Sequence, residues 1–313
     1  MGINIPNYDD IRQEEGFKNV YLSNVYPAPS KTTIQFFSEA DSELICEHGK
    51  DALLLQVALH ELVGHGTGKL FTKKDNGEIN FNKDAVNPFN GEAITTFYLE
   101  KETWSQKFGK LHSGYEECRA DTVALYLANF DGPFEIFFAE QSREQWNNIY
   151  YVSYLSSIRG ALIGLEYFNV EKKLWTQAHI WGRWVIFTAL REGDPELIKF
   201  EFFKDEEGND DFKIHVDREK LRTTGYKAIS EFLHKLHVYK SIGDFDTASK
   251  FFEHYSKVSE DDMKIRGIIL AKKKPRRMEL QPNVFADGTY KDYDITNEGI
   301  IESYQARWEG GAF

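Results

Sequence analysis

The sequence has few cysteines, no secretory signals and no long apolar run. Only Cys46 and Cys118 occur among 313 residues, and no Asn-x-Ser/Thr sequon is present. Nothing therefore suggests a disulfide framework or a secretory route. The start, Met1–Pro6, lacks the regions of a signal peptide, and Pro6 replaces the Ser or Thr of a myristoylation signal. No apolar run approaches the roughly 18–20 residues of a membrane span. We expect a soluble cytosolic protein without membrane contact.

Basic residues are also fewer than acidic residues. There are 38 Lys and Arg residues against 50 Asp and Glu residues, which gives a formal net charge of −12. A phosphate backbone would be repelled on average, so we expect no nucleic-acid partner. The basic run Lys272–Arg277 is short, and we interpret it as local structure or an anion site. An ordinary solvated turn is the alternative.

Apolar and aromatic residues, by contrast, are abundant. Hydrophobic residues make up 41% of the chain and aromatic residues 15%, including 24 Phe and 16 Tyr. This composition excludes a disordered protein. A chain of 313 residues can bury one large core or two modest ones, and we expect one main domain with an appendage.

The order of elements predicts a mainly α fold with minor β structure. Residues 1–50 read as connecting chain and short strands, with a strand at Thr32–Phe37, and Thr72–Glu92 reads as a long polar loop. A hairpin is predicted from 200–203 and 212–216, and an extended tail from Ile265 to Phe285. Helices are predicted at 52–65, from an N-cap at Ser113 through Leu127, and at 143–168, 172–192, 226–239, 244–257 and 295–308. No strand–helix alternation supports a doubly wound sheet.

The segment His60–His65, with the sequence His-Glu-Leu-Val-Gly-His, is the strongest local signal for chemistry. Imidazole and carboxylate side chains suit zinc. On an ideal helix a spacing of five residues turns the second imidazole about 140° away from the first. Both can reach one metal only if the helix widens locally, and Gly64 makes such a π-type bulge plausible.

The ordinary alternative is that His60 and His65 are satisfied core histidines. Glu61 argues against that reading because a carboxylate within the apolar run Leu53–Leu59 is costly to bury unless it is paired or functional.

A catalytic zinc also needs a third protein ligand. The pair Glu116 and Glu117 can supply one, because adjacent carboxylates diverge by about 100° on a helix and only one would bind the metal. The other, or Asp121, could support a ligand histidine. The alternative is that both glutamates are solvated acids in a first helical turn. Cys118 is interpreted as a packing residue rather than a ligand.

A phosphate-binding loop at Gly64–Leu70 fails on spacing. Val63 and Leu70 occupy the positions where that motif requires Gly and Ser or Thr.

These residues resemble the dipeptidyl peptidase III family. Two motifs characterise that family: His-Glu-x-x-Gly-His, and a downstream Glu-Glu-Cys-Arg-Ala-Glu/Asp. In this sequence they correspond to His60–His65 and Glu116–Asp121. Further similar stretches are Asn4–Asp10, Glu15–Val20, Gln177–His179 and Gln281–Asn283. The resemblance implies that residues 1–313 correspond to the C-terminal, mostly helical catalytic lobe, without the family's β-rich N-terminal lobe and with a shortened tail.

The resemblance implies a role for each matching residue. It assigns one zinc ion per chain to His60, His65 and Glu117, with Glu61 as general base and Glu116 and Asp121 supporting the ligands. His179 would contact substrate near the reacting carbonyl. Substrate would be bound by Asn4, Asn7, Arg183, Arg276 and Arg277.

The implied activity is release of dipeptides from the N-terminus of short peptides by a monomer. A gluzincin-type aminopeptidase is a rival, but the five-residue histidine spacing argues against it. A rival of another class is a zinc-binding fragment or interaction module that lacks turnover because half of the cleft is missing. The presence of Glu61 favours an active peptidase, whereas the absence of the N-terminal lobe favours a zinc-binding protein without turnover.

Overall fold

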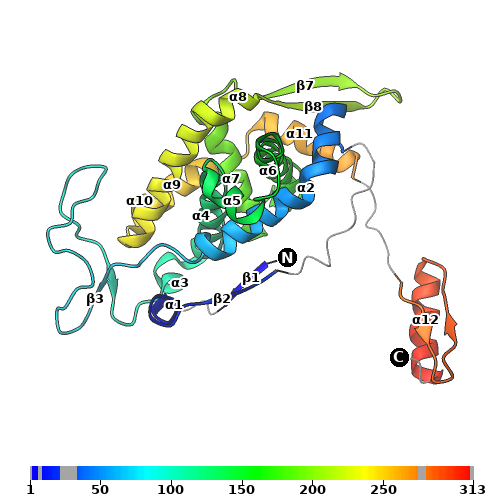
Figure 1. Cartoon of the computed structure of the whole chain (residues 1–313), viewed down its shortest axis with the longest axis horizontal. Helices are drawn as coiled ribbons and strands as arrows, with labels where there is room; N and C mark the ends of the chain where they lie inside the picture. The colour runs from blue at the N-terminus through cyan, green and yellow to red at the C-terminus, as the bar shows by residue number, and fades with distance from the viewer. Residues whose placement is uncertain (1, 6–8, 22–33, 274–279, 311–313) are drawn as a thin grey trace. The chain divides into compact units, whose positions relative to one another are not determined.

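A computed structural model describes residues 2–5, 9–21, 34–273 and 280–310 of the chain. The chain divides into two units, Met1–Leu270 and Ala271–Phe313, and both contain helices (Figure 1). The helices that begin in the first unit are α1 (Asp9–Glu14), α2 (Glu39–Leu59), α3 (Trp104–Phe108), α4 (His112–Leu127), α5 (Asp131–Phe137), α6 (Arg143–Ile163), α7 (Ala178–Gly193), α8 (Arg218–Lys220), α9 (Tyr226–Ser241), α10 (Phe245–Tyr255) and α11 (Glu260–Ala271). The mainly α class is confirmed.

The strands of the first unit form separate pairs. The antiparallel pairs are β1 (Gly2–Ile5) with β2 (Lys18–Tyr21), β5 (Phe168–Asn169) with β6 (Leu174–Trp175), and β7 (Ile198–Lys204) with β8 (Asp210–Val216), whereas β3 (Thr72–Lys73) and β4 (Tyr98–Leu99) are parallel. The β7–β8 pair is the predicted hairpin. On β8, Phe212, Ile214 and Val216 are buried, whereas the residues between them are exposed, as expected for a strand with one face on the core.

Helix α4 lies within the core and packs against α2, α7 and α9. Tyr115 and Cys118 of α4 and Trp184 of α7 are fully buried. The Tyr115 hydroxyl donates a hydrogen bond to the Leu236 carbonyl of α9 at 3.0 Å. On α7, Gly182 lies so close to α4 that a Cβ atom at this position would be 2.7 Å from the Cys118 amide nitrogen. The prediction that Cys118 packs is therefore confirmed. This close packing holds the segment 116–121 between three helices.

Capping explains where two long helices begin. The Ser38 side chain accepts a hydrogen bond from the Asp41 amide at the start of α2, so this helix already covers residues 39–50, where we predicted connecting chain. Ser142 and Gln145 form a reciprocal capping box at the start of α6.

The predicted strand at Thr32–Phe37 is wrong over residues 34–37, which are the part that the structure describes. They form a turn, in which Phe36 has a left-handed φ of 74° that a strand does not allow. The Phe36 ring stacks on Phe212 with centroids 4.5 Å apart, and its carbonyl accepts a hydrogen bond from the Ile214 amide. Tertiary packing therefore outweighs the local β preference.

Other boundaries differ from the predictions. The α7 helix begins at Ala178 rather than 172, because the β5–β6 pair occupies the preceding residues. Helix α6 ends at Ile163 and continues as a short 3₁₀ helix to Tyr167. Ser113 lies inside α4 and is not its N-cap. Part of the tail predicted to be extended is helical, since Ile265 and Ile269 lie one turn apart in α11 and are both buried.

The second unit contains the antiparallel pair β9 (Asn283–Val284) and β10 (Tyr290–Lys291) and the predicted C-terminal helix, α12 (Asn297–Gly310). Asn283 is fully buried in this unit. Its amide nitrogen donates to the Ser303 carbonyl at 2.8 Å, and its side-chain oxygen accepts from Arg307 at 2.6 Å. These bonds link the strand pair to α12.

Candidate metal centre

The end of α2 widens into one turn of π-helix, η2, at His60–Gly64. The His65 amide donates to the His60 carbonyl at 2.9 Å, which is the i to i+5 hydrogen bond of a π turn. The bulge predicted from the five-residue spacing is confirmed. It brings the imidazole rings of His60 and His65 to a centroid distance of 4.7 Å, with the rings perpendicular to each other.

Each histidine is oriented by a carboxylate at its Nδ1 atom. His60 Nδ1 lies 2.7 Å from Asp121 Oδ1, and His65 Nδ1 lies 3.0 Å from Glu116 Oε1. An ionised carboxylate only accepts hydrogen bonds, so both Nδ1 atoms carry the proton. The Nε2 lone pairs are then available for a metal, as in the carboxylate–histidine–zinc arrangement.

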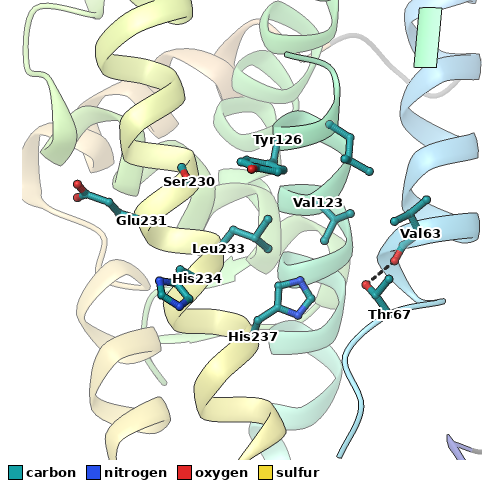
Figure 2. A pocket seen from close by; sticks show the side chains of 10 residues that line it. Val63, Thr67, Val123, Tyr126, Ser230, Glu231, Leu233, His234 and His237 are labelled. Carbon is teal, nitrogen blue, oxygen red and sulfur yellow. Dashed lines mark hydrogen bonds between the residues drawn. The ribbon is translucent and has the colours of Figure 1, made fainter. Parts of the chain in front are cut away.

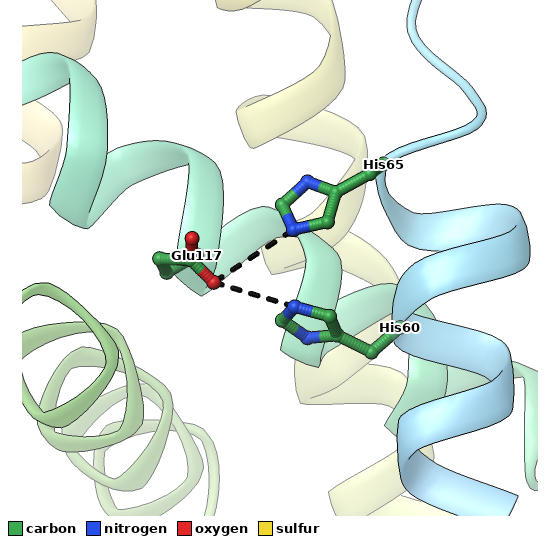
Figure 3. A group of neighbouring side chains, drawn as sticks. All are labelled: His60, His65 and Glu117. Atoms are coloured by element: carbon green, nitrogen blue, oxygen red, sulfur yellow. Dashed lines mark ion pairs between the residues drawn. The ribbon is translucent and has the colours of Figure 1, made fainter. Parts of the chain in front are cut away.

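Both Nε2 atoms face Glu117 of α4 (Figure 3). Glu117 Oε2 lies 3.3 Å from His60 Nε2 and 3.8 Å from His65 Nε2. When both imidazoles are unprotonated at Nε2, this buried oxygen and the two imidazole lone pairs are three acceptors that converge on one point. Such a set of acceptors fits a cation. Among the residues that the structure describes, it is the one group of three or more metal-ligand side chains close enough to hold an ion.

The electrostatics of the metal-free site follow from these contacts. Burial by itself lowers the pKa of His60, but Asp121 and then Glu117 outweigh it and raise the pKa from 6.5 to about 10. Burial opposes ionisation of Asp121, yet the charges of His60 and Arg183 hold the pKa of this carboxyl well below its usual range. In the metal-free chain His60 is therefore protonated at Nε2 as well as at Nδ1 near pH 7, and it must lose the Nε2 proton before this atom can bind a metal.

Glu116 is held by two buried cations in addition to His65. Burial disfavours its ionisation, but Arg119 and Lys240 keep the pKa of the Glu116 carboxyl well below its usual range. Arg119 donates to both Glu116 oxygens, and Lys240 Nζ lies 2.7 Å from Oε2. Arg119 also donates to the carbonyl of Gly64, which connects α4 to the π-helix.

Glu61 follows the first histidine and is buried, with 8% of its surface exposed. Strand β1 lies beside it. A Cβ atom on Gly2 would be 2.6 Å from Glu61 Oε1, so a larger residue at this position would have to displace the Glu61 side chain. Asn4 of the same strand donates to the Glu61 carbonyl at 3.0 Å and to Asn19 Oδ1 at 2.8 Å. Asn4, predicted to bind substrate, thus joins β1 to the π-helix in this structure.

His179 and Arg183 lie one turn apart on α7, and each contacts a carboxylate of α4. His179 Nε2 is 3.2 Å from Glu117 Oε2, and its side chain is half exposed. Arg183 Nε is 3.5 Å from Asp121 Oδ2. The structure therefore brings both residues to the metal-ligand cluster. Asn7, Arg276 and Arg277 lie outside the described residues.

Arg119, Lys240 and Arg12 also contact the centre and were not among the residues predicted from the sequence. Arg119 stands inside the second motif, so its spacing from Glu116 could have indicated the contact. Arg12 of α1 donates to the His65 carbonyl, and Lys240 comes from α9. No spacing relationship in the sequence connects either of them to the histidines.

A pocket of about 510 Å³ lies between η2, α4 and α9 (Figure 2). His237 lines it, and burial together with Arg119 and Lys240 lowers the pKa of His237 to about 3, so the ring is neutral. The remaining lining residues include both apolar and polar side chains: Val63, Thr67, Val123, Tyr126, Leu127, Ser230, Glu231, Leu233 and His234.

In the described part of the chain, none of the helices combines the length and the apolar character needed to cross a bilayer.

Comparison with known proteins places this chain in a family. The sequence matches the model of Peptidase family M49 over residues 1–308. The dipeptidyl peptidase 3 of Nematostella vectensis is 42% identical over 99% of this chain and 43% of its own length, and that of Homo sapiens is 37% identical over 98% and 43%. The chain therefore spans less than half the length of these relatives.

Solved structures show the same fold. Dipeptidyl-peptidase III from Corallococcus sp. strain EGB matches with a TM-score of 0.54 and 16% identity, over 84% of this chain and 40% of that one. The structure of DPP III from Caldithrix abyssi matches with a TM-score of 0.50 and 20% identity, over 86% and 42%. Since the family model covers nearly the whole sequence, the chain belongs to peptidase family M49.

Proposed function

We propose that the chain provides the zinc centre of a metallopeptidase that releases dipeptides from the free N-terminus of short peptides. Residues 1–313 would then correspond to the C-terminal catalytic portion of a longer family member. The observation that carries the proposal is the convergence of the Nε2 atoms of two histidines on one buried Glu117 oxygen. The names of the relatives support the substrate class.

In this proposal His60, His65 and Glu117 hold one zinc ion, and Asp121 and Glu116 fix the histidine rings. Two imidazoles, one carboxylate and an open position form a common ligand set of catalytic zinc. When bound, zinc would act as a Lewis acid that polarises the scissile carbonyl and lowers the pKa of water towards about 7.

The protein residues then move the protons. Glu61 accepts a proton from the attacking water and delivers it to the amine that leaves. Burial beside Gly2 restricts the positions that the Glu61 carboxylate can take. His179 is a donor at the reacting carbonyl, where it would stabilise the charge that develops on oxygen. Its position beside Glu117 supports this role.

In this proposal the substrate is bound by Asn4, Asn7, Arg183, Arg276 and Arg277. We propose that the two asparagines bind the amino-terminal residues of the peptide and so determine the cleavage point. Arg183 forms an ion pair with Asp121 at the metal-ligand cluster. This contact supports a position for Arg183 beside the bound substrate. Because the net charge is −12, these cations would supply local positive charge on an acidic protein. A cytosolic location and a monomeric state stay predictions.

The second candidate function is zinc binding without catalytic turnover. The observation that favours it is the length of the chain, which covers 43% of the relatives that it matches. A substrate held by fewer groups is less well oriented, and orientation can account for several kcal/mol of a reaction barrier.

Product analysis by mass spectrometry tests the proposal. The zinc-loaded chain is incubated with a pentapeptide and with the same peptide acetylated at its N-terminus. We expect the N-terminal dipeptide from the free peptide alone. Glu61→Gln at equal zinc content should be at least about 100-fold slower, the usual contribution of a positioned base. Cleavage of the acetylated peptide, or products of other lengths, would contradict a dipeptidyl peptidase. Zinc binding without cleavage would favour the second function.

A further inference from the structure

Lys240 is a buried lysine that reaches the metal centre from outside both sequence motifs. Only 6% of its surface is exposed. Its Nζ atom lies 2.7 Å from Glu116 Oε2, and the two residues are 124 positions apart in the sequence. A buried ammonium group is costly unless it is paired and hydrogen-bonded, so the position requires an explanation.

The four contacts of the Glu116 carboxylate explain how Lys240 could act on the metal centre. Oε1 contacts His65 Nδ1 at 3.0 Å and Arg119 Nη2 at 2.6 Å. Oε2 contacts Arg119 Nε at 3.0 Å and Lys240 Nζ at 2.7 Å. Both oxygens are therefore occupied, and the carboxylate has one orientation in which Oε1 faces the histidine.

Arg119 and Lys240 make different contributions to that orientation. Arg119 belongs to the same helix as Glu116, three residues later, so its contact moves with α4. Lys240 is the contact from a different helix, α9, and fixes Glu116 relative to that helix. The Lys240 backbone is in turn held in place, because its carbonyl accepts a hydrogen bond from the Tyr98 hydroxyl at 2.8 Å. Its ammonium lies 5.0 Å from the centre of the Trp104 ring.

From this geometry we propose that Lys240 is a positioning residue for the metal ligand His65 and acts through Glu116. The proposal rests on the zinc site of the proposed function. Lys240 does not touch the metal or the substrate; it holds the carboxylate that orients the ligand ring.

Charge and positioning make opposite predictions for the loss of Lys240. If the lysine acted only as a nearby positive charge, its removal would tighten zinc binding, because one cation that repels Zn²⁺ is gone. If it positions Glu116, its removal would weaken zinc binding, as for other groups that support a metal ligand. The direction of the change therefore distinguishes the two roles.

The test is a competition titration of zinc with a chromophoric chelator, which gives the zinc dissociation constant of each variant. We expect Lys240→Met to bind zinc at least about 10-fold more weakly than the original chain, the usual lower bound for loss of such support. Lys240→Arg, which keeps a cationic donor, should recover most of the affinity. Lys227→Met is the matched control, because it removes the same charge from an exposed position on the same helix. It should bind zinc like the original chain.

A double-mutant cycle identifies Glu116 as the intermediary. In a Glu116→Gln background, Lys240→Met should add little further loss of affinity, because the group through which it acts is already changed. Circular dichroism of the metal-free variants checks that they are folded. If Lys240→Met does not fold, Lys240→Gln is compared in the same way, because its neutral amide is one bond shorter than the lysine side chain and does not reach Glu116.

Equal or tighter zinc binding by a folded Lys240→Met or Lys240→Gln variant would overturn the proposal, and so would full additivity with Glu116→Gln. Failure of the original chain to bind zinc would instead refute the proposed function itself.

Discussion

Gly64 of the π-helix lies against Ala120 of α4, so that a Cβ atom at position 64 would be 2.8 Å from the Ala120 Cα atom. The close approach places the two histidines beside the glutamates of α4. Glycine is therefore required here for space, because the neighbour is backbone that cannot rotate away.

We predict that Gly64→Ala destabilises the chain by about 1–3 kcal/mol, the usual cost of overpacking, and weakens zinc binding because the ligand-bearing turn is displaced. Urea unfolding and zinc titration measure the two effects. The control is Gly267→Ala in α11, where an added Cβ atom meets nothing within 4 Å. That variant should be more stable by about 0.5–1 kcal/mol, because alanine favours a helix. Similar stabilities of the two variants would contradict the packing argument.

The contact of Asp121 with His60 leads to a second prediction. Asp121→Asn keeps the size of the side chain but removes the charge that stabilises the ligand ring. Zinc affinity should fall by about 10- to 100-fold, the usual cost of such a change. Asp131→Asn, at an exposed acid on α5, is the control and should leave zinc affinity unchanged. An unaltered dissociation constant for Asp121→Asn would show that the carboxylate does not support the ligand.

Zinc binding should release a proton from His60. Its pKa in the metal-free chain is about 10, so the ring is protonated at pH 7 and must lose about one proton to bind the metal. Calorimetry at pH 7 in buffers with different ionisation enthalpies measures this release. In Asp121→Asn the main cause of the raised pKa is absent, and the release from His60 should decrease. Binding heats that do not depend on the buffer would refute the prediction.

The stability of the metal-free chain should depend on the same pair. The pKa of His60 is raised on folding, so its contribution is complete below about pH 6.5 and is lost as the pH rises through about 10. The pKa of Asp121 is lowered, so its contribution is present above its ordinary value of 3.8 and is lost as the pH falls further. Urea midpoints of the metal-free chain should therefore decrease between about pH 7 and 10. The slope should be smaller in Asp121→Asn, and an equal slope would contradict the pairing.

The local geometry of the site could be predicted from the sequence because its signal is local. Five residues between His60 and His65, with Gly64 before the second, require a wider turn if both rings are to meet. The hairpin of β7 and β8 was also predictable, because its alternation is confined to one segment.

The remaining features depend on contacts between distant segments. Phe36 adopts a left-handed conformation because its ring and carbonyl pair with β8, which no propensity at residues 32–37 indicates. Lys240 reads as an ordinary charged residue of an amphipathic helix until α9 is placed beside Glu116. Buried cations of this kind are determined by the packing of the helices, and the sequence alone does not show their partners.

The most direct test of the central claim is the zinc content of the purified chain after dialysis against excess metal, with His65→Ala and His215→Ala measured in parallel. His215 lies on β8 and pairs with Glu201, so its loss leaves the metal centre intact. We expect about one tightly bound zinc in the original chain and in His215→Ala, as for a site with three protein ligands. His65→Ala should lose most of its zinc. Undiminished zinc in His65→Ala, or no zinc in the original chain, would show that His60, His65 and Glu117 do not form the zinc site.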